Sequence, residues 1–361
     1  MSAAINPSLP RLPALDGLRF FAVAGVMAWH FSPGTLGQIG PWGDWGVRVF
    51  FVLSGFLITG ILLTSRTRID TGCITFAREY SHFYLRRALR LWPAYLLAIA
   101  ASLILSVAYA REMLVWNLTF TSNYYNTLEQ TWPGLLSHLW TLGVEFQFYL
   151  LWPVLLLVAP RSALLPSLIT LLVAGPAFRW LELYYIDATQ TNALFLLLPA
   201  NVDYFAWGAL LALPASLSSI QSKIKHPALY AALCYTGCLV TFYTPTLQSY
   251  ALWRALDCSL LGLGSYFLIL HLIRPEPSRL SRVCSFAPFV YLGRISYGIY
   301  LYHNFSHRLS PGIMRRLTGE SYLPNEFAHI GGLVIISILC GIVSWHIIEQ
   351  PINRLRLQRT T

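Results

Sequence analysis

Charged residues are scarce in this sequence. Only 11% of its 361 residues are Asp, Glu, Lys or Arg, whereas 56% are hydrophobic and the mean hydropathy is +0.55. Soluble domains usually carry about 25% charged residues, so these few charges could not cover such an apolar core in water. The composition therefore excludes an ordinary soluble protein, and the bilayer must be the solvent for much of the surface.

Acidic residues are the rarer sign of charge. There are 15 Asp and Glu against 25 Lys and Arg, which gives a formal net charge of +10. A basic protein can bind nucleic acid, but these basic residues collect in short loops between apolar runs and form no groove interleaved with aromatic residues. This distribution indicates membrane topology, and we expect no nucleic-acid partner.

Cysteine is also infrequent, and the sequence has no extra segment to fold separately. The six cysteines fall mostly in predicted spans or cytoplasmic loops and show no metal-ligand spacing with histidine, so we expect neither a disulfide framework nor a metal site. The segment from Leu18 to Phe31 contains Arg19 and lacks a cleavage site after it, which predicts an uncleaved first span. Without an internal repeat or a long linker, residues 1–361 are expected to form one membrane domain with no additional soluble domain.

Long apolar runs are what the sequence does contain. Tyr95–Tyr109, Leu150–Ala159 and Gly332–Val343 carry no charge and lie within longer runs, each close to the ~20 residues that cross ~30 Å of hydrocarbon. We predict an all-α polytopic membrane protein, a bundle of about ten transmembrane helices. The predicted spans cover approximately 14–32, 45–64, 84–109, 135–159, 163–185, 194–214, 227–246, 252–273, 288–309 and 328–349.

The basic residues are divided unequally between the two sides of this bundle. An even number of spans puts both termini on one side, and loops rich in Lys and Arg face the cytoplasm. If both termini are cytoplasmic, the outside loops carry chiefly Arg111, Arg308, Arg315 and Arg316. The inside segments then carry Arg11, Arg66, Arg68, Arg78, Arg86, Arg87, Arg90, Arg161, Lys223, Lys225, Arg274, Arg279, Arg282, Arg294, Arg354, Arg356 and Arg359. This asymmetry predicts cytoplasmic termini, with the longest loops near 65–82, 110–132 and 310–327.

Two ionisable residues lie in the first predicted span. An ionisable group at membrane depth costs at least ~2.5–3.5 kcal/mol on insertion scales, so each needs a reason. Arg19 and His30 are eleven residues apart, which puts them on nearly the same helix face and about 16 Å apart along it. His30 alone could be an interfacial histidine without a function. Because it shares a helix face with a buried arginine, the pattern favours a functional role for both residues.

Three arginines, Arg86, Arg87 and Arg90, open the third predicted span and are called the arginine cluster here. Such a cluster at the cytoplasmic face can contact anionic lipid headgroups. It can also clamp phosphates, because guanidinium groups bind phosphate oxygens in a bidentate manner, and acyl-CoA carries phosphates. The residues alone leave both interpretations open.

The second span carries charges that small-residue packing does not explain. Asp44 and Arg48 lie at its outer end and can pair at i,i+4, a structural role as well supported as a catalytic one. Ser54 lies deeper and allows close packing of helices. Asp203 and Asp257, in the sixth and eighth spans, are further buried carboxylates that we expect to be structural partners of arginines.

Two later spans also present polar side chains on one face. His138 and Glu145 in the fourth span are seven residues apart, so they share a face at about 10 Å, and Glu145 lies at a depth like that of His30. A carboxylate there can orient an imidazole or act as a base. In the ninth span Ser296, Tyr300 and His303 follow i, i+4, i+7 spacing, with His303 towards the outside.

Together these residues resemble the acyltransferase 3 family, bacterial integral-membrane O-acyltransferases that modify surface polysaccharides, lipo-oligosaccharides and related acceptors. The motifs occur in order over nearly the whole chain, with Thr141 where the family often has serine. They are Leu15-Asp16-Gly17-Leu18-Arg19 with His30, Gly46-Val47 with Phe50-Phe51-Val52-Leu53-Ser54-Gly55-Phe56, Arg87 and Arg90 with Pro93, His138-Leu139-Trp140-Thr141-Leu142 with Glu145, Phe148, Tyr149 and Pro153, Ile295-Ser296-Tyr297-Gly298 with Tyr300-Leu301-Tyr302-His303, and Glu349-Gln350-Pro351.

The resemblance implies a function and a location. Arg19, His30, Arg87, Arg90 and Glu145 match positions that the family is thought to need, and family members use acyl-CoA, usually acetyl-CoA, as the cytoplasmic donor. It therefore implies an acetyl-CoA-dependent O-acetyltransferase of the bacterial inner membrane. Its partners would be acyl-CoA, membrane lipids and a surface glycan or lipid-linked saccharide, with no permanently bound cofactor and no metal.

The predicted mechanism divides the work along the bundle. The arginine cluster, with Arg19 deeper, holds the CoA phosphates and directs the pantetheine arm inwards. His30 acts as a general base on an acceptor hydroxyl, or carries the acyl group itself as a nucleophile, and Glu145 supports His30 or orients the acceptor. Candidates for acceptor binding or support are Asp44, Arg48, Ser54, His138, Tyr300 and His303.

Two functions of other classes fit the same residues. A transporter also buries charges in a helical bundle, where they form proton relays or substrate paths, although an internal repeat would favour it more. A lipid-binding scaffold would make the shared face of Arg19 and His30 accidental. Transfer of label from acetyl-CoA to a surface glycan distinguishes the enzyme from both.

Overall fold

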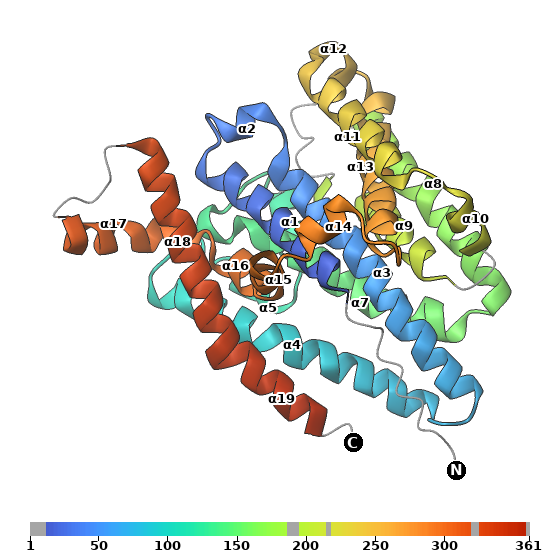
Figure 1. Cartoon of the computed structure of the whole chain (residues 1–361). Coiled ribbons are helices and arrows are strands. Elements are labelled where there is room, and N and C mark those ends of the chain that lie inside the picture. Colours follow the sequence, from blue (N-terminus) through green and yellow to red (C-terminus); the bar gives the residue numbers. More distant parts are fainter. Residues whose placement is uncertain (1–11, 186–194, 214–217, 319–324, 359–361) are drawn as a thin grey trace.

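The structure, a computed structural model, describes residues 12–185, 195–213, 218–318 and 325–358 (Figure 1), and these contain helices and no strand. The helices are α1 Pro13–Phe31, α2 Leu36–Ile39, α3 Trp42–Asp70, α4 Phe76–Ile104, α5 Leu114–Leu118, α6 Ser122–Leu128, η1 Gly134–Leu139, α7 Trp140–Val158, α8 Arg161–Tyr185, η3 Pro199–Asn201, α9 Val202–Ala212, α10 Ser218–Lys223, α11 Pro227–Tyr243, α12 Pro245–Gln248, α13 Ala251–Leu272, α14 Arg279–Cys284, α15 Ala287–Arg294, α16 Ser296–Tyr302, α17 Phe305–Thr318, α18 Glu326–Ser344, η4 Trp345–Glu349 and α19 Gln350–Gln358. The predicted all-helical fold is confirmed.

Six helical segments of the described chain are long and apolar enough to cross a membrane: Trp42–Asp70, Phe76–Ile104, Gly134–Val158, Arg161–Tyr185, Ala251–Leu272 and Glu326–Arg354. Large apolar side chains on these helices face outwards, as Leu151, Val173 and Ile335 do with 59–63% of their surface exposed. A soluble protein seldom exposes so much apolar surface. The chain is therefore a multi-pass membrane protein, whereas the count of ten spans and the sidedness of the termini stay predictions.

The predicted loops prove to be largely helical. In place of a loop at 65–82, α3 continues to Asp70 and α4 begins at Phe76. Gly72 provides the tight turn between them with a φ of +72°, a conformation that glycine adopts without strain. The side chain of Thr75 accepts a hydrogen bond from the backbone of Arg78 and caps α4. Residues 110–132 contain α5 and α6, and α17 and α18 occupy the described part of 310–327.

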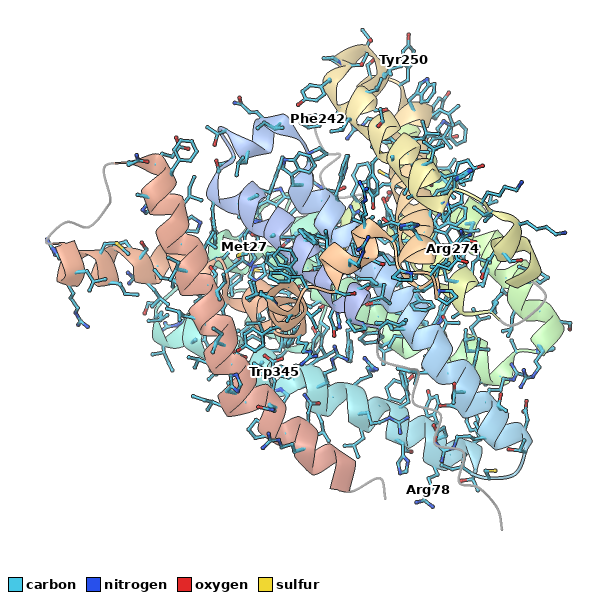
Figure 2. The ribbon with its side chains drawn as sticks, viewed as in Figure 1. Met27, Arg78, Phe242, Tyr250, Arg274 and Trp345 are labelled. Carbon is cyan, nitrogen blue, oxygen red and sulfur yellow. The ribbon has the colours of Figure 1, made fainter. Side chains whose placement is uncertain are left out.

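Two labelled residues mark the opposite ends of the molecule (Figure 2). Arg78 lies near the start of α4, at the end of the molecule where α3 turns into α4 and towards which α19 runs, and Tyr250 lies at the opposite end beside α12. Arg66 lies near the end of α3. Its Nη1 donates to the carbonyl oxygens of Leu156 and Ala159, which would otherwise lack a hydrogen-bond partner at the end of α7. Arg11 and Arg359 of the predicted inside set lie outside the described residues.

Helix α1 is seated by direct contact of backbones. A Cβ on Gly17 would lie 1.8 Å from the carbonyl oxygen of Cys284 in α14, and one on Gly293 of α15 would lie 1.7 Å from the carbonyl oxygen of Asp16. Only glycine permits so close an approach. The position of α1, which carries Arg19 and His30, is thereby fixed against the segment α14–α15.

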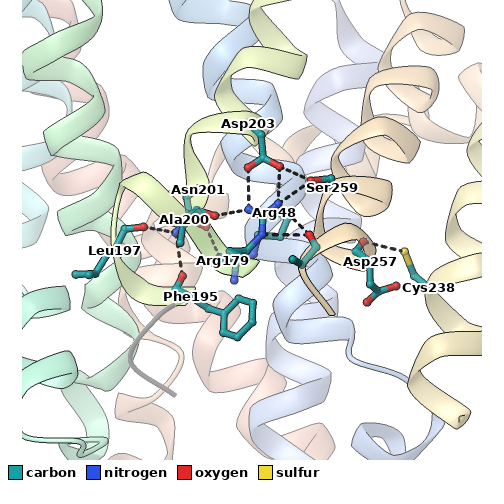
Figure 3. Close-up of polar contacts among 11 residues, drawn as sticks. Arg48, Arg179, Phe195, Leu197, Ala200, Asn201, Asp203, Cys238, Asp257 and Ser259 are labelled. Carbon is teal, nitrogen blue, oxygen red and sulfur yellow. Dashed lines mark hydrogen bonds and ion pairs between the residues drawn. The ribbon is translucent and has the colours of Figure 1, made fainter. Parts of the chain in front are cut away.

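Between α3, α8, α9 and α13 lies a fully buried ion pair (Figure 3). Arg179 and Asp203 form two parallel contacts of 2.7 and 2.9 Å, and Ser259 bonds to both partners. The Arg179 guanidinium also donates to the carbonyl oxygens of Ala200 and Ala255. The expectation that Asp203 pairs with an arginine is confirmed, with a partner that the sequence did not single out.

Arg48 extends this network towards the start of α3. Its Nη2 lies 2.9 Å from Oδ1 of Asp44, which confirms the i,i+4 pair, and its Nη1 donates to Oδ1 of Asn201 at 2.9 Å. Asn201 in turn donates to two backbone carbonyls. Asp257, by contrast, has no ion pair with an arginine among the described residues. Its backbone oxygen accepts from the thiol of Cys238 (Figure 3), so that expectation was wrong.

Candidate active site

A cavity of about 530 Å³ runs through the bundle between α1, α3, α4, α7 and α16. Its lining extends from Arg68 and Glu79, beside the turn between α3 and α4, to Thr141 and Tyr300. Its polar lining consists of Arg19, Ser54, Thr64, Ser65, Arg68, Glu79, Arg86, Arg87, Arg90, Thr141, Glu145, Tyr149, Ser296, Tyr297 and Tyr300. The volume lies in the range of small-molecule sites. The structure thus brings Arg19, the arginine cluster and Glu145 together in one cavity.

The cavity is strongly cationic, with five arginines against two glutamates in its lining. Arg19 enters the lining from α1, and Arg86, Arg87 and Arg90 enter it from α4. The Nε of Arg19 is buried and has no hydrogen-bond partner among the described residues. Arg87 lies over the rings of Phe83 and Tyr149, with its Cζ 5.9 and 5.7 Å from their centroids. Because the lining carries more positive than negative charge, this region is suited to an anionic ligand.

At the mouth of the cavity the arginines are arranged around a buried carboxylate. Glu79 is 2% exposed and accepts a hydrogen bond of 2.6 Å from Ser65. Arg86 and Arg68 lie 3.5 and 3.6 Å from its two oxygens. Arg86 is therefore already paired. Sequence analysis missed Glu79 and the place of Arg68, although a carboxylate seven residues before Arg86 on one helix face was a readable signal.

Glu145 lies in the second turn of α7. Its Oε1 accepts hydrogen bonds from Ser54 at 2.5 Å and from Tyr149, one turn further along α7. The contacts of His30 go instead to Val26 and His303. The predicted direct support of His30 by Glu145 is therefore absent from the described contacts, because the α7 turn that carries Glu145 faces α3 and the cavity. Ser54 orients this carboxylate, and Tyr149 is a second partner that the sequence motif contained without a role.

Tyr300 and Thr141 close the far end of the cavity. Their hydroxyl groups are 2.6 Å apart, and the Tyr300 hydroxyl donates to the carbonyl oxygen of His138 at 3.0 Å. The ring of Tyr300 packs against His138 and His303, with centroids 5.4 and 5.6 Å away. Tyr300 thus separates the cationic cavity from a second polar site.

That second site is a group of three histidines, His30, His138 and His303, which is called the histidine cluster here. His30 comes from the end of α1, His138 from η1 and His303 from the break between α16 and α17. Nε2 of His303 and Nδ1 of His30 are 3.3 Å apart. His30 and His303 are therefore neighbours, whereas Arg48 lies elsewhere, in the network of Figure 3, where it pairs with Asp44.

The geometry can be set beside known proteins. A model of an acyltransferase domain, that of the acyltransferase 3 family, matches residues 12–346. YrhL of Bacillus subtilis, named as a candidate peptidoglycan O-acetyltransferase, is 30% identical over 95% of this chain and 55% of its own length. Peptidoglycan O-acetyltransferase OatA of Listeria monocytogenes is 29% identical over 95% of this chain and 56% of its own.

O-acetyltransferase OatA of Staphylococcus aureus is 26% identical over 95% of this chain and 57% of its own length. The chain thus spans about half the length of these curated relatives. No solved structure matches it. Because the family model covers the cavity and the histidine cluster alike, from α1 to η4, the chain belongs to the acyltransferase 3 family.

Proposed function

We propose that this protein is an integral-membrane O-acetyltransferase of the bacterial inner membrane. It moves an acetyl group from cytoplasmic acetyl-CoA to a hydroxyl of a cell-surface polysaccharide, with peptidoglycan as the first acceptor to test. The observation that carries the proposal is a cationic cavity that ends against a histidine cluster. The names of the relatives, which describe peptidoglycan or other O-acetyltransferases, support the acceptor class.

The donor half of the proposal rests on charge. CoA carries phosphates at one end and an uncharged pantetheine arm at the other. Guanidinium groups bind phosphates through charge-assisted hydrogen bonds, so Arg87 and Arg90, with Arg19 deeper, are the proposed phosphate ligands. The pantetheine arm would follow the cavity towards Tyr300, past the fixed carboxylate of Glu145.

The acceptor half rests on the histidine cluster. His30 is half-buried on the α1 face that also carries Arg19, and it contacts His303, which packs against Tyr300 at the end of the cavity. A thioester is already activated, so positioning together with one general base supplies most of the required rate. His30 is the proposed base, and nucleophilic catalysis by the same ring is the alternative that trapping of an acyl-enzyme would reveal.

The test uses the full chain in lipid nanodiscs with acetyl-labelled CoA and peptidoglycan fragments. We expect label in the glycan together with release of the CoA thiol. In His30→Ala both should fall by about 10²- to 10⁴-fold, the contribution of a general base. The exposed His226→Ala, between α10 and α11, is the matched control and should keep full activity.

Two results would contradict the proposal. Equal labelling of the glycan by His30→Ala would remove His30 from the mechanism. If the wild-type protein labels no surface glycan but moves a solute into liposomes, the chain is a transporter and the cavity is a substrate path.

A further inference from the structure

The ring of His303 contacts both other rings of the histidine cluster. The centroids of His30 and His303 are 4.8 Å apart, and those of His138 and His303 are also 4.8 Å apart. His303 is fully buried and His138 is 3% exposed. Polar atoms buried this deeply are nearly always hydrogen-bonded, so their partners reveal which ring nitrogens carry protons.

Two of the rings are assigned by their backbone contacts, because a carbonyl oxygen can only accept. Nδ1 of His303 lies 2.6 Å from the oxygen of Tyr300, so Nδ1 carries the proton and Nε2 has a lone pair. Nε2 of His138 lies 3.2 Å from the oxygen of Leu301 and carries the proton. Its Nδ1 accepts from the amide of Asn304 at 3.1 Å. Both nitrogens of His138 are therefore occupied.

His30 differs from both of these rings. Its Nδ1 lies 2.9 Å from the carbonyl oxygen of Val26 and therefore carries the proton. The same Nδ1 lies 3.3 Å from the lone pair on Nε2 of His303. The remaining nitrogen, Nε2 of His30, has a lone pair and no hydrogen-bond partner in the described part of the chain. It is the nitrogen of the cluster that is left for a substrate.

We propose that His303 is the positioning residue of the transfer reaction. Its Nε2 accepts the Nδ1–H of His30, together with Val26, and so fixes the ring that takes the acceptor proton. The inference deepens the proposed function and rests on it. His138, held at both nitrogens, packs against the ring of His303 and keeps it in place.

The transfer step moves one acetyl group and one proton. The acceptor hydroxyl loses its proton to Nε2 of His30 while its oxygen forms a bond to the thioester carbonyl carbon, and the carbon–sulfur bond breaks. The imidazolium of His30 then holds two protons, and the one on Nδ1 is shared with His303. The proton on Nε2 passes finally to the CoA thiolate, which leaves as the thiol. This is the arrangement of a serine-protease triad with a neutral imidazole in place of the carboxylate.

Two substitutions of His303 separate hydrogen bonding from packing. His303→Met fills the space without an acceptor, and we expect kcat for acetyl transfer to fall about 10- to 100-fold with KM for acetyl-CoA unchanged, less than the loss of the base itself. His303→Gln offers a side-chain oxygen to His30 and should restore a large part of kcat. His307→Gln is the matched control, since His307 packs on Phe31 without bonding to His30, and its kcat should equal that of the wild type.

A second measurement does not depend on activity. Nitrogen-15 chemical shifts of histidine-labelled protein distinguish protonated ring nitrogens from bare ones, and the His30 signals are identified by their loss in His30→Gln. We expect protonated Nδ1 and bare Nε2 in His30, with the Nδ1 signal shifted in His303→Met. If the wild type transfers no acetyl group but this shift occurs, the proposed function fails and the contact stands. An unshifted His30 signal, or equal kcat in His303→Met and the wild type, would overturn the role of His303.

Discussion

Two groups of arginines lie inside this bundle, and they differ in what surrounds them. Arg179 has its carboxylate, a hydroxyl and two backbone carbonyls within hydrogen-bonding distance, in a space with no exposed surface. Arg19 and Arg90 line the cavity instead and are only half-buried. A buried charge with its counter-ion inside the fold stabilises the fold. A charge that lines a cavity can also bind an anion from outside.

The largest effect is expected from breaking the ion pair of Arg179 and Asp203. Arg179→Met leaves Asp203 as a buried carboxylate without its cation, which costs about 3–5 kcal/mol. We expect a large loss of thermal stability in detergent and poor accumulation in membranes. The double variant Arg179→Met/Asp203→Leu removes both charges and should recover much of the loss. If Arg179→Met is as stable as the wild type, the ion pair does not hold α8 to α9.

The next largest effect is expected on substrate binding and not on stability. Arg90→Met removes a cation from the cavity lining, so we expect thermal stability to change little, because Arg90 is only half-buried and has no ion pair among the described residues. The KM for acetyl-CoA should rise about 10- to 100-fold, the equivalent of one charge-assisted hydrogen bond of ~1.5–3 kcal/mol. Kinetics and thermal unfolding of the same preparation measure both. A destabilised Arg90→Met with normal KM would place Arg90 with the structural group.

Arg48 was predicted as a candidate site residue, but its contacts belong to the buried ion network. Arg48→Lys keeps the charge but cannot fork between Asp44 and Asn201. We expect a loss of stability of about 1–2 kcal/mol, as for a buried hydrogen bond to a charged group. The KM for acetyl-CoA in the protein that remains folded should match that of the wild type. A raised KM would bring Arg48 into donor binding after all.

The smallest expected effect comes from salt. Raising ionic strength from about 0.05 to about 0.5 M shortens the screening length severalfold, so the KM for acetyl-CoA should rise a few-fold at the open mouth. The enclosed Arg179 pair is shielded from salt, and the thermal midpoint should change little. A KM independent of salt would argue against phosphate binding by these arginines.

Much of this arrangement could be predicted from the sequence. Hydropathy and the cost of intramembrane charge single out Arg19 and His30, and topology puts Arg19 on the side of Arg87 and Arg90. The juxtaposition of His30 with His303 follows from their common depth. These inferences work because depth in a bilayer is encoded along the chain.

Neighbourhood within the bundle is not encoded in that way. Glu145 and His30 have similar depth, yet α7 turns Glu145 towards Ser54 and the cavity. Arg179 lay within a predicted span and could have been noticed as an ionisable residue, but its pairing with Asp203 depends on how α8 packs on α9. The predicted loop near 65–82 was too long, because the polar ends of α3 and α4 have the composition of a loop.

The contacts at Gly17 and Gly293 give α1 a further property. Arg19 and His30 stand on one rod, and that rod touches α14 and α15 backbone to backbone, with no side chain between them to yield. The positions of Arg19 at the proposed donor site and of His30 at the proposed acceptor site therefore cannot change independently. During divergence of such enzymes towards new acceptors, change should accumulate on the helices that face α1 while α1 itself keeps its register.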